Sequence, residues 1–146
     1  MARAVRIRHT GIVVSDLDRA LRFYRDLLGL DIKRRMVESG PCIANVLGLP
    51  DVVVETVKLG LDDEGTQIEL LSFISHSVSA PEGNRALLIG PTHVALTVAN
   101  LGDLYAKMFA AGIEFNCPPQ DSPDGKVTLT YCRDPDGNLV ELVEVR

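Results

Sequence analysis

Residues 9–30 read HTGIVVSDLDRALRFYRDLLGL, and this stretch decides the fold of the chain. Its first part, up to Val14, is mainly β-branched and apolar, which favours a strand. Asp16 then stands where a helix needs an N-cap, and apolar residues recur after it at helical spacing. Gly29 lies where a helix commonly ends in a left-handed residue. The stretch therefore predicts a strand that leads directly into an amphipathic helix.

The same pattern returns at residues 93–112, which read HVALTVANLGDLYAKMFAAG. His93 opens this second strand as His9 opens the first. Asn100 takes the capping place of Asp16, each seven residues after its histidine, and Gly112 ends the second helix. The interval of about 84 residues is longer than the period of solenoid repeats. We conclude that the chain contains two copies of one supersecondary unit.

Short strands are expected after each helix. In the first half they cover 30–36, 52–59 and 66–73, with a further candidate at 42–46, and in the second half 113–116, 127–131 and 139–145. Polar turns at 62–65 and 134–138 precede the last strand of each half. Each half therefore reads βαβββ, an α+β pattern. We expect a single domain over 1–146, with module 1 at about 5–73, a connection at 74–91 and module 2 at about 92–146.

Composition limits the class of protein. The 146 residues are 46% hydrophobic and 24% charged, with a net charge of −5, which suits one soluble domain with a proper core. The longest basic run, at 33–35, is too short for a nucleic-acid surface. No apolar stretch approaches the roughly 20 residues that span a bilayer, and the first residues lack the apolar core of a signal peptide. We expect neither a nucleic-acid nor a membrane partner.

Three cysteines, Cys42, Cys117 and Cys132, form no CxxC motif and cannot all pair. Reduced thiols in a cytoplasmic protein are the simplest interpretation. Without a pattern that marks a nucleophile, we expect these cysteines to be structural.

The last expected strand of each half contains one glutamate among apolar residues. Glu69 lies in QIELL and Glu141 in NLVELV, each among apolar residues. An ionised carboxylate in such surroundings is costly to bury unless it is paired or bound to a metal. An exposed strand edge would explain one such glutamate. That alternative is weaker for two glutamates in matching places, each with a matching histidine.

The four repeated residues form a candidate metal site made of His9, Glu69, His93 and Glu141. Two imidazoles and two carboxylates suit Zn, Ni, Co, Mn or Fe(II), and leave one or two positions for water or substrate. Strand alternation puts His9 on one face of its strand with Gly11 and Val13, and Glu69 on one face of its strand with Gln67 and Leu71; the second half repeats this parity for His93 and Glu141. His76, in the polar connection, has no counterpart in the repeat and is expected to be structural.

These residues match a known family. The chain resembles the vicinal oxygen chelate superfamily, which includes glyoxalase I, methylmalonyl-CoA epimerase, extradiol dioxygenases and bleomycin- or fosfomycin-resistance proteins. The resemblance covers nearly the whole chain and is carried by residues 9–30, by IELL at 68–71, by HVALTV at 93–98 and by RDPDGNLVE at 133–141. It implies two tandem βαβββ modules forming a cupped mixed eight-stranded sheet, with the helices outside. It also implies a homodimer and one divalent metal on His9, Glu69, His93 and Glu141.

The resemblance leaves several reactions open, and proton transfer next to a carbonyl fits best. In this superfamily the metal binds two neighbouring substrate oxygens and acts as a Lewis acid. We expect a lyase or isomerase of glyoxalase or epimerase type that acts on a small substrate or thioester, with Glu141 as the base and Glu69 as the alternative base. Methylmalonyl-CoA epimerases tend to carry Gln where Glu69 stands, and residues 38–55 do not resemble the substrate-binding stretch of glyoxalase I. The particular substrate is therefore not readable.

Two alternatives remain. Residues 131–141, including Tyr131, resemble part of the signature of Fe(II) extradiol dioxygenases. That signature also needs a histidine where residues 122–126 have none, and it leaves no role for Glu69. A non-enzymatic antibiotic-binding protein is the weaker alternative, because such members typically lack the metal ligands.

Overall fold

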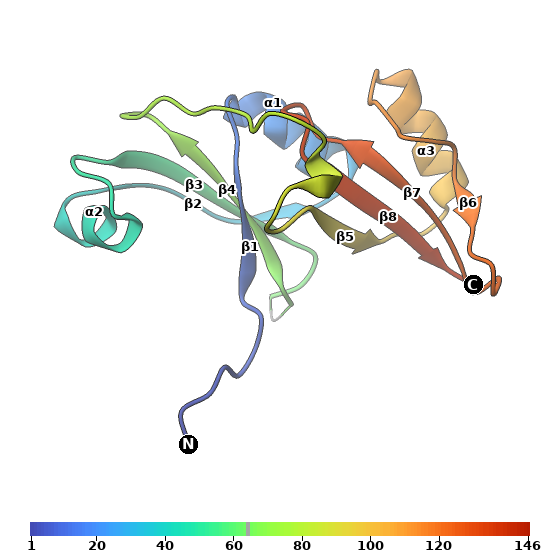
Figure 1. The fold of residues 1–146 in the computed structure, drawn as a ribbon, viewed down its shortest axis with the longest axis horizontal. Coiled ribbons are helices and arrows are strands. Elements are labelled where there is room, and N and C mark those ends of the chain that lie inside the picture. The colour runs from blue at the N-terminus through green and yellow to red at the C-terminus, as the bar shows by residue number, and fades with distance from the viewer. Residues whose placement is uncertain (64) are drawn as a thin grey trace. The chain divides into compact units, whose positions relative to one another are not determined.

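The chain folds into two compact units, Met1–Ser79 and Ala80–Arg146. The computed structural model describes residues 1–63 and 65–146. Each unit contains one four-stranded sheet and its own helices (Figure 1). No helix in the described residues is both long and apolar enough to cross a membrane.

Unit 1 begins with a strand and a helix, as the sequence predicts. Its elements are β1 (His9–Val13), α1 (Leu17–Leu21), the π-helix η1 (Arg22–Leu27), β2 (Asp31–Ser39), α2 (Pro41–Leu47), β3 (Val53–Gly60) and β4 (Gln67–Phe73). The strand order is β1-β4-β3-β2. β1 runs parallel to β4, and the other neighbours are antiparallel.

Unit 2 repeats this topology. Its elements are the 3₁₀ turn η2 (Arg85–Leu87), β5 (His93–Thr97), α3 (Leu101–Ala110), β6 (Gln120–Asp121), β7 (Val127–Arg133) and β8 (Leu139–Val145). The strand order is β5-β8-β7-β6, with β5 parallel to β8. The α+β class and the tandem βαβββ arrangement are confirmed, and the eight strands divide into one mixed four-stranded sheet for each unit.

A helix packs against the central strand of each sheet and closes the core. In unit 1, α1 packs against β4, and Tyr24 and Leu70 are fully buried. In unit 2, α3 packs against β8, and Met108 and Leu142 are fully buried. Burial of one such side chain stabilises the fold by about 1.5–3 kcal/mol. Because strand residues alternate, Glu69 and Glu141 lie on the faces opposite Leu70 and Leu142.

Residues 42–46 form part of helix α2, so the prediction of a strand there is wrong. Gly40, at φ 92°, turns the chain out of β2, and Pro41 occupies the first turn of the helix. Proline is well tolerated in that first turn because its missing N–H would be unpaired there. Gly48, at φ 67°, ends α2 in the left-handed conformation.

The strand expected at 113–116 is also not formed. In this segment Phe115 makes a single isolated bridge to Cys132, and the edge of the sheet is the two-residue strand β6. Asn116 N–H still donates to the Tyr131 carbonyl oxygen at 2.9 Å. Pro118 and Pro119 follow and lack the N–H groups that a longer ladder would need.

The expected helix ends are confirmed in position, and of the two N-cap residues only Asp16 caps with its side chain. Asp16 Oδ1 accepts a hydrogen bond from Arg19 N–H at 2.8 Å, as an N-cap does. Gly29 and Gly112 both have positive φ, 78° and 83°, at the ends of the two helical segments. Asn100 occupies the N-cap position of α3 as expected, but its side chain makes no capping hydrogen bond.

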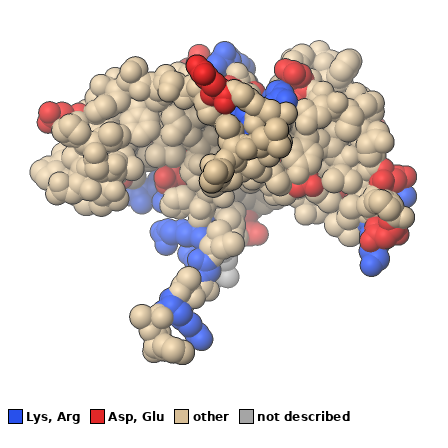
Figure 2. Space-filling view, in the orientation of Figure 1, with Lys and Arg blue, Asp and Glu red and all other residues tan. Residues whose placement is uncertain are grey.

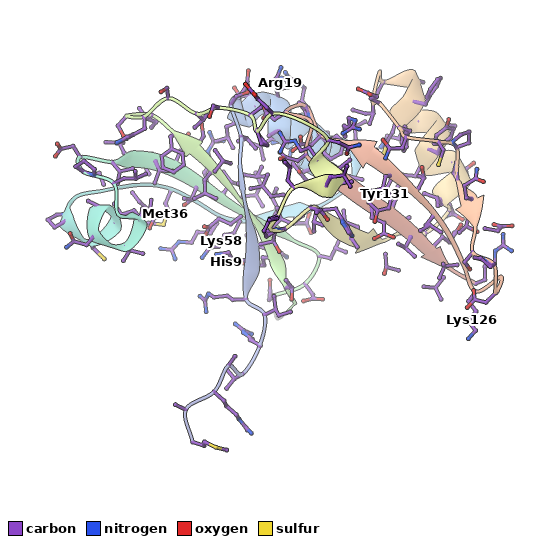
Figure 3. All side chains as sticks on the ribbon, in the orientation of Figure 1. His9, Arg19, Met36, Lys58, Lys126 and Tyr131 are labelled. Carbon is purple, nitrogen blue, oxygen red and sulfur yellow. The ribbon has the colours of Figure 1, made fainter. Side chains whose placement is uncertain are left out.

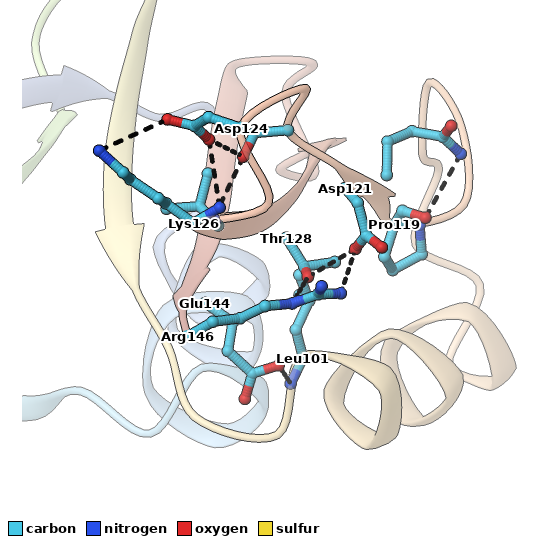
Figure 4. A network of polar contacts seen from close by, with 11 residues as sticks. Leu101, Pro119, Asp121, Asp124, Lys126, Thr128, Glu144 and Arg146 are labelled. Atoms are coloured by element: carbon cyan, nitrogen blue, oxygen red, sulfur yellow. Dashed lines mark hydrogen bonds and ion pairs between the residues drawn. The ribbon is translucent and has the colours of Figure 1, made fainter.

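A carboxylate from another element caps α3 instead. Glu144, in β8, accepts hydrogen bonds from the N–H groups of Asn100 at 2.6 Å and Leu101 at 3.3 Å. Figure 4 shows the bond between Glu144 and Leu101. Asn100 itself adopts φ 55°, which aims its backbone N–H at this carboxylate.

The two turns that precede the glutamate strands were expected from their polar residues. At 134–138, Asp134 Oδ1 accepts from Asp136 N–H at 2.9 Å and from Asn138 N–H at 2.8 Å, which closes the turn before β8. In the turn expected at 62–65, Glu64 lies outside the described residues.

Candidate functional site

In unit 1 the first and last strands bring His9 and Glu69 together. β1 and β4 pair in parallel with Gly11 opposite Glu69, so His9 stands two residues along the same face. His9 Nε2 lies 3.6 Å from Glu69 Oε1, and the Glu69 side chain is 15% exposed. We call the side of each sheet that carries its histidine and glutamate the ligand face.

Unit 2 reproduces this pair. β5 and β8 pair with Ala95 opposite Glu141, which is the register of Gly11 and Glu69. His93 Nε2 lies 3.2 Å from Glu141 Oε2, and the Glu141 side chain is 17% exposed. The duplication therefore preserves the geometry of both pairs as well as their residue types.

Each pair has the spacing of two ligands on one metal ion. Donor atoms at about 2.0–2.2 Å from a metal lie about 2.9–3.6 Å apart in octahedral or tetrahedral geometry. The observed separations are 3.6 Å and 3.2 Å. No group of three or more His, Cys, Asp or Glu side chains gathers among residues 1–63 and 65–146. Each unit thus supplies two fitting donors, and the four-ligand set stays a hypothesis.

The two histidines differ in the hydrogen-bond partner of the ring nitrogen Nδ1. His93 Nδ1 lies 2.8 Å from Thr92 Oγ1, a contact of the kind that orients metal-binding imidazoles. His9 Nδ1 is buried and has no hydrogen-bond partner in the described chain. The His9 ring is therefore positioned by packing and by Glu69, and one of its nitrogens is unsatisfied.

Sequence reasoning missed a third residue in unit 1. Lys58, in β3, stands directly opposite Glu69, and its Nζ lies 3.5 Å from Glu69 Oε2. The Lys58 side chain is 20% exposed. The two oxygens of Glu69 thus have different partners, with His9 at one and an ammonium at the other. Figure 3 labels Lys58 and His9 on their strands.

Tyr131 holds the corresponding position in unit 2. It stands opposite Glu141 in the register of β7 and β8, and its hydroxyl lies 3.2 Å from His93 Nε2. The Tyr131 and His93 rings meet edge to face, with centroids 5.1 Å apart. Burial raises the pKa of Tyr131, and the negative charge of Glu141 and a hydrogen bond to it add to the effect. At neutral pH the phenol therefore keeps its proton.

The remaining candidate residues lie apart from these pairs. Burial, followed by the charge of Asp134, raises the pKa of Cys132 to about 12, so this thiol is a poor nucleophile. Cys42 and Cys117 are exposed. His76 Nδ1 lies 2.7 Å from its neighbour Ser75 Oγ, a local contact on the surface.

Unit 2 also contains a cavity of about 330 Å³, lined by Gly112, Ile113, Glu114, Arg133, Asp134, Pro135 and Gly137. None of the four candidate ligands lines it. Arg133 within it is held by Glu114, with 3.5 Å between Nε and Oε1.

Each of the two βαβββ units carries one His–Glu pair on its first and last strands, which defines a protein made of two paired modules. The chain belongs to the Glyoxalase/Bleomycin resistance protein/Dioxygenase superfamily, whose model matches residues 6–142.

Individual relatives cover the whole chain or only part of it. The chain is 28% identical to a probable lactoylglutathione lyase of Synechocystis, over 93% of this chain and 92% of the relative. It is 46% identical over 57 residues to a biphenyl-2,3-diol 1,2-dioxygenase of Rhodococcus globerulus, a match that covers 37% of this chain and 28% of that enzyme. The crystal structure of a glyoxalase family protein from Bacillus cereus matches with a TM-score of 0.87 at 25% identity, covering 99% of this chain and 96% of that one.

Proposed function

We propose that this protein is a divalent-metal-dependent lyase or isomerase of glyoxalase or epimerase type. It would move a proton next to the carbonyl of a small substrate or thioester. The observation that carries the proposal is the repeated His–Glu pair, at 3.6 Å in unit 1 and 3.2 Å in unit 2. Full-length similarity to proteins named as lactoylglutathione lyases supports the same class of reaction.

His9, Glu69, His93 and Glu141 would hold one divalent metal, of the set Zn, Ni, Co, Mn and Fe(II). When bound, such a metal polarises the substrate carbonyl and stabilises the negative charge that develops on its oxygen. The fit rests on the donor spacing within each pair and on the Thr92 contact that orients His93. A metal that supplies positive charge also offsets the cost of burying two carboxylates.

Glu141 is the preferred base, and Glu69 is the alternative. Glu69 is shared with the Lys58 ammonium at 3.5 Å. Glu141 faces the neutral phenol of Tyr131 in the same register position. Glu141 is therefore the carboxylate with fewer charged competitors, and it is the better placed of the two to take up a substrate proton.

Metal analysis of purified variants tests the site. Wild type should retain stoichiometric divalent metal after dialysis, whereas Glu69→Ala and His93→Ala should lose most of it. Both variants should also lose turnover of the hemithioacetal of methylglyoxal and glutathione, and proton exchange next to the carbonyls of other small thiol adducts and thioesters in D₂O. His76→Ala lies outside the site and serves as the control. If Glu69→Ala and His93→Ala keep both metal and turnover, the site assignment is wrong.

An Fe(II) extradiol dioxygenase is the second candidate. It is favoured by Tyr131, which touches His93, and by the local match to a biphenyl-diol dioxygenase. Oxygen uptake with catechols by the Fe(II)-loaded protein, without proton exchange on carbonyl substrates, would support it over the lyase. Metal retention without either activity would favour a binding protein.

A further inference from the structure

The ligand face of unit 1 carries a row of charged residues that crosses three strands. Gly11, Glu69, Lys58 and Arg34 stand directly opposite one another in β1, β4, β3 and β2. Directly opposite residues project from the same face of a sheet. One carboxylate is thus followed by two cations, and the first of these, Lys58, touches Glu69.

An irregularity in β2 adds a third cation to this face. The register shifts between Ile32 and Arg34, which makes Lys33 the extra residue of a bulge. Lys33 Cε lies 3.9 Å from the position that a Cβ on Gly60 would occupy, so Lys33 also reaches the side on which Lys58 projects. Its Nζ lies 3.4 Å from Oδ1 of the exposed Asp63. The next residue, Arg35, points to the other face and pairs with Glu55.

Lys33 and Lys58 each have a carboxylate neighbour, whereas the Arg34 side chain has none among the described residues. Like charges directly opposite in neighbouring strands are destabilising, yet Arg34 faces Lys58. Arg34 is exposed, and its side chain makes no hydrogen bond or ion pair with any residue the structure describes. Further cations lie on the N-terminal segment before β1 and belong to no strand of the sheet (Figure 2). Lys58 has Glu69, but that carboxylate is also a candidate metal ligand.

The duplication provides an internal comparison. In unit 2 the residue opposite the glutamate is Tyr131, which is uncharged, and β6 pairs with β7 only at Leu129 and Thr128. The pairing of the glutamate strand with its inner neighbour therefore forms without a cation opposite the glutamate. The cations Lys58 and Arg34 are therefore a feature of unit 1 and are not required by the fold.

We propose that Arg34 and Lys58 bind an anionic group of the substrate, a carboxylate or a phosphate, beside Glu69. This rests on the proposed function, because it makes the ligand face of unit 1 the place where the substrate lies. An arginine can hold such a group with two parallel hydrogen bonds, and a half-buried lysine adds a point charge. The substrate class is then a small carbonyl compound or thioester that carries a negative charge.

Anion titration of the whole chain tests this proposal. Inorganic phosphate and acetate are titrated by calorimetry into metal-free wild type, Arg34→Gln, Lys58→Met and Arg35→Gln. We expect Arg34→Gln and Lys58→Met to weaken binding about tenfold or more, because each removes a charge-assisted hydrogen bond. Arg35→Gln, one residue away on the other face, should bind as wild type does. Tighter binding of phosphate than acetate would identify a phosphate group, and the reverse order a carboxylate.

Arg34→Gln decides the result, because Arg34 is exposed and touches no candidate ligand. The proposal is overturned if wild type binds neither anion, if Arg34→Gln binds as wild type does, or if Arg35→Gln is weakened equally. Metal content of the same samples separates this from the proposed function. Anion binding that depends on Arg34 in a protein without metal affinity supports the anion site and refutes the metal enzyme. If the protein binds metal but Arg34→Gln binds anions as tightly as wild type does, the metal site is supported and the anion site is refuted.

Discussion

At the scale of single residues, the two units carry different side chains at a matching position of their strand register. Lys58 and Tyr131 occupy the same register position opposite a glutamate, and one is a cation while the other is a neutral phenol. Glu69 and Glu141 therefore have different electrostatic surroundings in spite of their matching strands. Such a difference is what an enzyme needs in order to give two equivalent carboxylates separate roles.

Cys132 gives a prediction for alkaline pH. Burial, then the charge of Asp134, raises its pKa from 9.0 to about 12 in the folded chain. Its contribution to stability is therefore complete below pH 9 and is lost as the pH rises towards 12, because the unfolded thiol ionises first. The free energy of unfolding should fall in this range by at most about 1.4 kcal/mol per pH unit from this group.

Urea unfolding of wild type and Cys132→Ala at a series of pH values from neutral to alkaline measures this effect. Lysines and tyrosines titrate in both proteins, so the difference between the two curves isolates the thiol. The wild-type advantage should shrink as the pH rises above 9. A constant difference between the two proteins would show that Cys132 ionises as easily in the folded chain as in the unfolded one.

At the scale of elements, the N-termini of the helices show when local sequence is sufficient to predict a helix cap. Asp16 caps α1 with an oxygen three residues from the N–H that it accepts, so local sequence predicts it. The cap of α3 comes from Glu144, 44 residues from Asn100 along the chain. A partner so distant has no signature in the residues around the helix.

Substitutions at this cap should show that Glu144 contributes more to the free energy of unfolding than the Asn100 side chain does. Glu144→Gln keeps the size of the side chain but removes its charge at the helix N-terminus, and it should lower the free energy of unfolding by about 1 kcal/mol. Asn100→Gly should change it by only a few tenths, because the Asn100 side chain makes no capping bond and glycine accepts φ 55° readily. Urea unfolding at neutral pH measures both. A larger loss for Asn100→Gly than for Glu144→Gln would contradict this assignment of the cap.

The same reasoning explains how much of the structure could be predicted. The strand–helix pair at 9–30 and its repeat follow from local periodicity, and both are present. Residues 42–46 were wrongly predicted as a strand because Pro41 and Gly48 mark the helix more strongly than the short apolar run marks a strand. Lys58 was missed because it lies 11 residues before Glu69, whereas Tyr131 lies 10 before Glu141. Only the strand register shows that these two positions correspond.

At the scale of the whole molecule, each unit supplies one half of the proposed metal centre. A His–Glu pair offers two donors, and a tightly bound transition metal in a protein commonly has three or four protein ligands. The proposed function therefore needs both pairs. The prediction that the chain is one domain depends on the same proposal. Loss of a ligand from either unit should then have the same consequence.

Metal-dependent thermal stability tests this dependence. A metal that binds only the folded chain stabilises it by about 2.7 kcal/mol when its free concentration is about 100 times Kd. Wild type should therefore unfold at a higher temperature with added Zn²⁺, Ni²⁺ or Mn²⁺ than with a chelator. Glu69→Gln in unit 1 and Glu141→Gln in unit 2 should each abolish most of this shift, while Glu55→Gln, whose carboxylate pairs with Arg35, should retain it. If only one of the two site variants loses the shift, the metal is held by that unit alone, and the four-ligand centre is wrong.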